Sequence, residues 1–116
     1  MNILNPFKIN SIILPNRITV ASMCQYSAKN GNPSYWHYGH LQQLANSGAG
    51  MLMFESTAIN LNGRITLKDL ALSNTKNEIS FRQIINYLKT ISKIPLGLQI
   101  SHSGRKGSAQ VPWVKS

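Results

Sequence analysis

The stretch Met51-Leu52-Met53-Phe54-Glu55 consists of four apolar residues followed by one acid. A short, almost unbroken apolar run is typical of a strand that is buried on both faces of a parallel sheet. Upstream, Ser34 can cap a helix that runs from about Tyr35 to Ser47, and Gly48 and Gly50 then end it. The run at 51–55 therefore predicts a central strand that follows a helix.

A second helix and a third strand follow this central strand. Asn77 can cap a helix over about Glu78–Ser92, and Pro95 precedes a strand over Leu96–Ile100, with a loop from Ser101. The apolar residues of the helix recur at helical spacing: Phe81, Ile84, Ile85, Leu88 and Ile91. A long polar connection through Asn60, Asn62, Gly63 and Arg64 joins the central strand to this helix.

The N-terminal part supplies a hairpin and the first strand of the sheet. Phe7–Ile9 and Ile12–Leu14 flank Asn10-Ser11 and predict a small hairpin, and the β-branched run Arg17–Ser22 predicts a strand. The order is then strand, helix, strand, helix, strand. This alternation predicts an α/β fold with parallel strands and right-handed crossovers.

Composition limits the function classes. The 116 residues form one domain at most, and twelve Lys and Arg against three acids give a net charge of +9. Only Arg105 and Lys106 are adjacent cations, and no aromatic residues run between the others, so nucleic-acid binding is disfavoured. No segment resembles a signal peptide or a membrane span. The single cysteine, Cys24, excludes an internal disulfide and favours a cytoplasmic protein.

Polar or sulfur-bearing side chains follow each of the three predicted strands. They are Met23 to Tyr26 after the first strand, Ser56 and Thr57 after the second, and Gln99 to Lys106 around the end of the third. Ligands of parallel α/β proteins bind at the carboxyl ends of the strands. We therefore expect a ligand site at this rim.

Six short segments, in this order, carry a resemblance to a known family. They are Pro15-Asn16-Arg17-Ile18, Met23-Cys24-Gln25-Tyr26-Ser27, Trp36-His37-Tyr38-Gly39-His40, Glu55-Ser56-Thr57-Ala58-Ile59-Asn60, Gly63-Arg64-Ile65-Thr66 and Gln99-Ile100-Ser101-His102-Ser103-Gly104-Arg105-Lys106. Together they resemble the old yellow enzyme family of ene-reductases, in its thermophilic-like, xenobiotic-reductase branch. The resemblance implies that residues 1–116 are the N-terminal portion of a (β/α)8 TIM barrel, which takes about 250 residues in all.

The same resemblance implies an FMN cofactor that NADPH or NADH reduces, and an activated alkene such as an enone as substrate. Cys24 and Tyr26 match residues at the reacting centre. The Cys24 thiol would tune the flavin, and the Tyr26 phenol would donate to the substrate carbonyl. Without the family, Cys24 could be a small buried hydrophobe and Tyr26 a ring packed on a loop.

The residues that match cofactor-binding positions are Ala21, Ser22, Met23, Cys24, Ser56 and Gln99. The Gln99 amide would pair with the flavin pyrimidine edge, although a glutamine here can also cap a strand end. Met23 and Ser56 would approach the flavin through backbone atoms. Ala21-Ser22 replaces a pair that usually contains proline, and the loss of that proline is expected to free the backbone.

His37 and His40 lie three residues apart, which would place both on one helix face, and a zinc site would need His102 or Glu55 as further ligands. The family resemblance instead implies that these histidines brace the helix against the rim, and no metal is expected. Arg105-Lys106 can cradle an anion or form a solvated loop.

The resemblance also bears on what this chain does alone. The family's substrate-binding histidine pair and FMN phosphate loop match no residue here, so we expect a truncated segment that is inactive by itself. The alternative is a non-catalytic partial barrel that associates with a partner, either another copy or a complementing C-terminal chain. A partial barrel exposes apolar edges, so without such a partner the chain should fold poorly and melt without a sharp transition, as circular dichroism can test.

Overall fold

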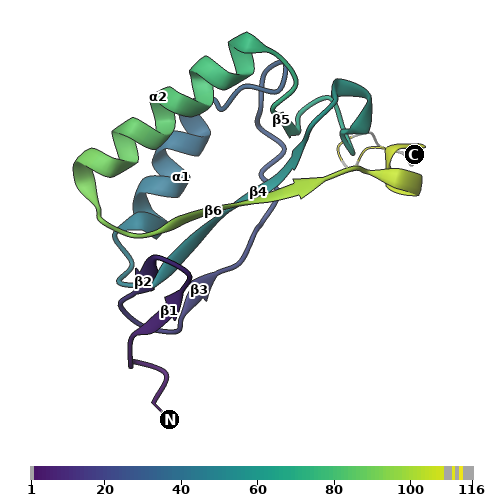
Figure 1. Cartoon of the computed structure of the whole chain (residues 1–116). Helices are drawn as coiled ribbons and strands as arrows, with labels where there is room; N and C mark the ends of the chain where they lie inside the picture. Colours follow the sequence, from purple (N-terminus) through teal and green to yellow (C-terminus); the bar gives the residue numbers. More distant parts are fainter. Residues whose placement is uncertain (1, 109–110, 112, 114–116) are drawn as a thin grey trace.

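The computed structural model describes residues 2–108, 111 and 113, in which two helices cover one face of a small parallel sheet (Figure 1). The helices are α1 (Tyr35–Ala45) and α2 (Thr75–Ile91). The sheet contains β3 (Thr19–Val20), β4 (Met51–Ala58), β5 (Leu70–Ala71) and β6 (Leu96–Ser101). The alternation of strand, helix, strand, helix, strand is therefore confirmed, with β5 as an addition.

Strand β4 is the centre of the sheet because each of its edges is paired. Leu52 is paired with Val20 of β3 on one edge and with Leu96 of β6 on the other, and all these pairings are parallel. The short strand β5 pairs with Thr57 and Ala58 near the end of β4, on the same edge as β3. Each strand pair thus points its carboxyl ends toward the same rim.

An extra residue interrupts the pairing of β4 with β6. Phe54 is opposite Leu98 and Thr57 is opposite Ile100, so Glu55 and Ser56 together face only Gln99. Such a bulge shifts the alternation of side chains along the strand. Phe54 and Glu55 consequently both lie on the helix side, where Phe54 joins the core and Glu55 contacts His37 of α1.

The core lies between the sheet and the two helices. Leu52 and Phe54 of β4 pack against buried apolar residues of the helices, among them Leu41, Phe81, Ile84 and Leu88. Helix α2 has a clear apolar face, and burial of each such side chain contributes about 1.5–3 kcal/mol. Met51 and Met53 are half-buried on the opposite face of the sheet, where the ends of their side chains lie beside Gly97.

The N-terminal hairpin has the predicted bounds, β1 (Phe7–Ile9) and β2 (Ile12–Leu14). Its turn places Asn10 in the left-handed region, at φ 50°, which asparagine tolerates better than most residues. The Arg17 guanidinium lies 5.0 Å from the centre of the Phe7 ring and ties the hairpin to the segment that leads into β3.

The prediction that Asn77 caps the second helix is wrong. Asn74 is the cap, and its side chain accepts a hydrogen bond from the backbone N–H of Asn77 at 2.9 Å. Asn77 is instead a buried residue of the first helical turn, and its amide donates to Asn30 O and Asn32 Oδ1. Two asparagines three residues apart both satisfy the capping pattern, and burial of the second one decides between them.

Other boundaries also differ from the predictions. The first strand is shorter than Arg17–Ser22, and the first helix ends at Ala45, two residues before Ser47. Strand β4 continues beyond Glu55 to Ala58, and β6 includes Ser101. Two 3₁₀ helices, Leu61–Gly63 and Gly104–Ser108, lie in segments that were predicted as connections. The strand limits could not be read from β-propensity, because pairing with β4 sets them.

Two glycines make a matched pair for a test of packing. A Cβ atom on Gly50 would lie 2.1 Å from the backbone oxygen of Asn16, whereas a Cβ on Gly39 of α1 would meet nothing within 4 Å. We expect Gly50→Ala to lower the free energy of unfolding by about 2 kcal/mol, because the backbone at Asn16, which leads into β3, must move. Gly39→Ala should raise it by about 1 kcal/mol through helix propensity. Urea unfolding of both variants checks this, and equal effects would contradict it.

Candidate functional site

A cavity of about 420 Å³ lies at the carboxyl ends of the strands. The residues that line it come from the segment after β3, from β4, and from β6 and its continuation: Cys24, Ser56, Ile65, Gln99, Ser101, His102, Ser103, Arg105 and Lys106. Its volume lies within the range of about 300–1,000 Å³ that is usual for small-molecule sites. The rim predicted from the strand ends is therefore a real hollow in the structure.

Three of the predicted site residues meet in this cavity. Cys24, Ser56 and Gln99 line it, although 75 residues separate the first from the last. Ala21, Ser22, Met23 and Tyr26 are not among the lining residues, and they belong to the same strand-end segment as Cys24. The Tyr26 ring lies edge-on to Trp113, with ring centroids 5.8 Å apart.

Tyr26 has an unusual backbone conformation, with φ at 49°. A left-handed conformation costs about 1–2 kcal/mol for a residue with a Cβ, so neighbouring contacts must hold it. On one side, Gln25 N–H donates to Glu55 Oε2 at 3.2 Å, and on the other, Ala28 N–H donates to Lys68 O at 2.9 Å. The chain between Cys24 and Ala28 is therefore pinned at both ends of the strained residue.

Ser22 does not leave the backbone free, contrary to the prediction from its replacement of proline. Its hydroxyl donates a hydrogen bond of 2.8 Å to Phe54 O of β4. The pairing of β3 with β4 ends at Val20, and this hydrogen bond holds the chain against β4 beyond that point. The segment that leads to Cys24 is thus attached to the central strand by a side chain rather than stiffened by a ring.

The surroundings of Cys24 keep its thiol protonated. Burial raises the pKa of Cys24 above its ordinary 9.0, and the carboxylates of Asp69 and Glu55 raise it further. A backbone hydrogen bond at Ser56 and the charge of Lys106 lower the pKa but do not reverse the result. The pKa of Tyr26 is also raised, first by burial, so its phenol remains a hydrogen-bond donor at neutral pH.

The cavity offers uncommitted polar groups next to cationic ones. The Gln99 side chain makes no hydrogen bond within the part of the chain that the structure describes, and it presents both a donor and an acceptor. Ser56 and Ser101 hydroxyls bond to each other across β4 and β6. Arg105 and Lys106 also line the cavity. This combination suits a polar ligand of negative charge.

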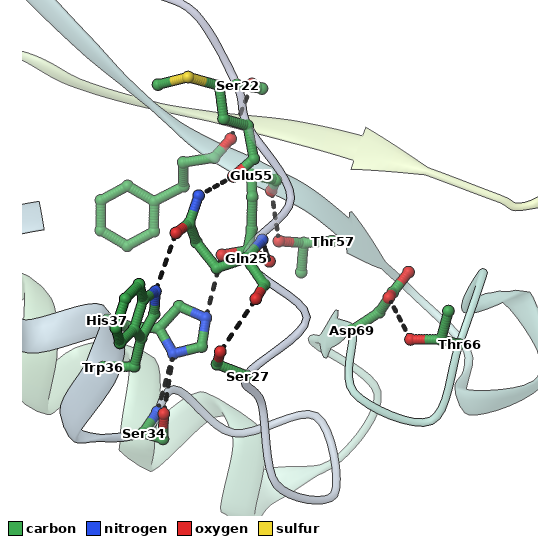
Figure 2. A network of polar contacts seen from close by, with 12 residues as sticks. Ser22, Gln25, Ser27, Ser34, Trp36, His37, Glu55, Thr57, Thr66 and Asp69 are labelled. Atoms are coloured by element: carbon green, nitrogen blue, oxygen red, sulfur yellow. Dashed lines mark hydrogen bonds and ion pairs between the residues drawn. The ribbon is translucent and has the colours of Figure 1, made fainter. Parts of the chain in front are cut away.

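A network of polar contacts joins the segment after β3 to the start of α1 and to β4 (Figure 2). The His37 side chain is fully buried, and its Nε2 lies 3.0 Å from Oε1 of Glu55, whose side chain is 5% exposed. The other ring nitrogen, Nδ1, accepts the backbone N–H of Ser34 at 3.0 Å. The Gln25 side chain forms a second link, since its Nε2 donates to Met23 O and its Oε1 accepts from Trp36 Nε1 at 2.8 Å.

This network confirms that His37 braces α1, and it adds Glu55 as its partner. Because Nδ1 accepts from a backbone amide, the proton of a neutral His37 ring is on Nε2, which faces the carboxylate. The sequence presented Glu55 only as one possible metal ligand. A buried acid directly after an apolar strand was the signal that could have identified it, because such an acid needs a partner.

The second histidine, His40, is partly exposed and has a different environment. Burial lowers its pKa, and the nearby Glu55 carboxylate opposes that shift. Within residues 2–108, 111 and 113, no three His, Cys, Asp or Glu side chains gather as a metal site requires. No helix in this part of the chain is long and apolar enough to cross a bilayer.

The sequence and fold resemble known proteins. Residues 2–112 match the family described as the NADH:flavin oxidoreductase / NADH oxidase family. An NADH:flavin oxidoreductase of Gibberella zeae is 37% identical over 112 residues, which are 97% of this chain and 27% of that protein. An NADPH dehydrogenase of Bacillus cytotoxicus is 33% identical over 104 residues, or 88% of this chain and 30% of that protein.

Solved structures show the same fold. Morphinone reductase superposes with a TM-score of 0.80 at 21% identity. The match covers 90% of this chain and 27% of the morphinone reductase chain. The old yellow enzyme from Trypanosoma cruzi gives 0.81 at 23% identity, with 90% and 28% covered. The chain thus spans less than a third of these relatives, and the prediction of the N-terminal part of a TIM barrel is confirmed.

The Cys24 environment predicts how its thiol reacts. Since only the thiolate is alkylated, the rate of carboxamidomethylation by iodoacetamide should rise with a midpoint above pH 9.0. Lys106→Gln removes a charge that favours the thiolate and should move the midpoint higher still. Lys93→Gln, in the segment that precedes β6 and outside the cavity lining, is the control and should leave the midpoint in place. A midpoint below pH 8 in the unaltered chain would refute this description.

Proposed function

Because the chain belongs to the NADH:flavin oxidoreductase / NADH oxidase family, we propose that its strand-end cavity holds the ring system of FMN. The observation that carries the proposal is the meeting of Cys24, Ser56 and Gln99 in one cavity. In this proposal the chain contributes one part of an FMN-dependent reductase that uses NADPH or NADH. The relatives named NADPH dehydrogenase support that choice of reductant.

The residues present fit such a cofactor. An isoalloxazine ring has a pyrimidine edge with alternating donors and acceptors, and the uncommitted Gln99 amide can pair with both kinds. Cys24 and Ser56 supply small polar groups beside it, so that a flat ring can approach the strand ends. Arg105 and Lys106 add positive charge to the lining, which favours an anionic ligand.

FMN supplies hydride transfer between a nicotinamide and the β-carbon of an activated alkene such as an enone. The chain's own residues would bind and orient the flavin ring and the substrate. Gln99 would hold the ring edge, and Met23 and Ser56 would approach the ring through backbone atoms, with Ala21 and Ser22 beside Met23. The protonated Cys24 thiol donates a hydrogen bond without adding charge. Tyr26, whose phenol is also protonated, donates to a substrate oxygen that gains negative charge.

Titration with FMN tests the proposal on the full chain. We expect the flavin fluorescence to be quenched in a saturable manner, because the ring enters a cavity rather than a surface. Gln99→Ala should weaken binding about tenfold, since it removes hydrogen bonds to a buried polar edge. Gln43→Ala on α1, outside the cavity, is the matched control and should bind as the unaltered chain does. Equal affinities for all three proteins, or no quenching at all, would refute the proposal.

A second candidate function is a non-catalytic module that associates with another copy of the chain. A hollow of about 470 Å³ between α2 and β6 favours it, lined by apolar residues that include Phe54, Phe81, Ile85, Leu96 and Leu98. Within the described residues, β6 pairs only with β4, so its outer edge can accept a further strand or helix. Apolar surface of this kind marks interaction sites.

The second candidate predicts a uniform oligomer that does not bind flavin. Ile85→Lys places a charge in the hollow and should dissociate the oligomer, because an unpaired charge is costly to bury. Ile79→Lys, an exposed position on the same helix and outside the hollow, should leave it intact. Light scattering after gel filtration measures the mass of each variant. A monomer in the unaltered chain would exclude this candidate.

A further inference from the structure

We propose that Glu55 is a positioning residue that fixes the segment from Ser22 to Ser27, and with it the cavity side chain Cys24, from behind the site. The inference rests on the proposed function for its meaning, because that segment would lie against the flavin. Glu55 itself is not among the residues that line the cavity. It therefore acts through the backbone of Gln25 and not by contact with a ligand.

Both oxygens of Glu55 have separate tasks. Oε2 accepts the backbone N–H of Gln25 at 3.2 Å, and Oε1 lies 3.0 Å from Nε2 of His37. His37 is the third residue of α1, and it accepts the N–H of Ser34 in the way that a glutamate or glutamine does in a capping box. The start of α1, the central strand and the segment after β3 are therefore joined through one carboxylate.

The requirement for a carboxylate follows from the ring nitrogens of His37. Because Nδ1 accepts from Ser34 N–H, Nε2 carries hydrogen, and the Glu55 carboxylate oxygen 3.0 Å away faces it as an ion-pair contact rather than an aligned hydrogen bond. Gln25 N–H needs a second acceptor. A glutamine in place of Glu55 has one oxygen and one NH₂ group, so it can serve only one of these two donors. An NH₂ group would then face the other donor in place of a carboxylate oxygen.

The bulge in β4 makes this arrangement possible. In a regular strand, Glu55 would lie on the opposite face from Phe54, away from α1. The extra residue instead turns Glu55 toward His37 while Ser56 still reaches the cavity. The acid that positions the segment and a serine that lines the cavity are thus adjacent in the chain and point to different sides.

Glu55→Gln tests the inference, with Glu78→Gln as the matched control. Glu78 undergoes the same chemical change at an exposed pair with Arg82 on α2, far from the network. The readout is the pH profile of Cys24 alkylation. Loss of the Glu55 charge alone would lower the midpoint of that profile, because this carboxylate raises the pKa of Cys24. Loosening of the segment would in addition raise the high-pH plateau, and we expect about a fivefold increase.

Three outcomes separate the proposals. A plateau in Glu55→Gln equal to that in Glu78→Gln would overturn the positioning role. A raised plateau together with at least fivefold weaker FMN binding supports it, whereas a raised plateau in a chain that never binds FMN supports the positioning role and refutes the flavin site. If Glu55→Gln does not fold, hydrogen exchange of the unaltered chain decides. The Gln25 amide should exchange far more slowly than that of Asn30, whose N–H donates no hydrogen bond within the described residues, and equal rates would overturn the inference.

Discussion

The bulge where Glu55 and Ser56 face Gln99 determines how the helices and the site relate to each other. On the helix side it brings a carboxylate to His37 of α1, and on the other side it brings a hydroxyl to the cavity. In a regular strand Phe54 and Glu55 would lie on opposite faces, so the bulge is what places both of them on the helix side. The Glu55 carboxylate also accepts from Gln25 N–H, so the bulge joins the segment after β3 to both the central strand and α1.

The apolar pattern was sufficient to predict the sheet and its helices, because the buried faces follow simple periods. The hairpin has the predicted bounds, and Leu52, Phe54, Phe81 and Leu88 all lie in the core. The predictions that were wrong or missing concern local features, namely a helix cap and a short strand. Asn74 and Asn77 are both acceptable caps in sequence, and only the burial of Asn77 among polar partners separates them. Strand β5 pairs with Thr57 and Ala58 near the end of β4, and its two residues are too few to show an alternating apolar pattern.

The location of the site could be predicted from the order of the strands. Residues at strand ends converge whenever the strands are parallel, which is why Cys24, Ser56 and Gln99 meet. The functions assigned to them, and to Tyr26 and Met23, remain predictions from the family resemblance. Neither the bulge nor the use of both Glu55 oxygens was visible in the sequence, since each depends on a register that a single apolar run does not encode.

A titration of the ¹⁵N-labelled chain with FMN, followed by NMR, shows whether three strand ends form one flavin-binding cavity. We expect the amide signals of Cys24, Ser56 and Gln99 to shift together and to saturate at one FMN concentration, while those of Ile85 and Lys89 beside the α2–β6 hollow stay in place. Shifts centred on Ile85 and Lys89, with the three cavity residues unmoved, would contradict it.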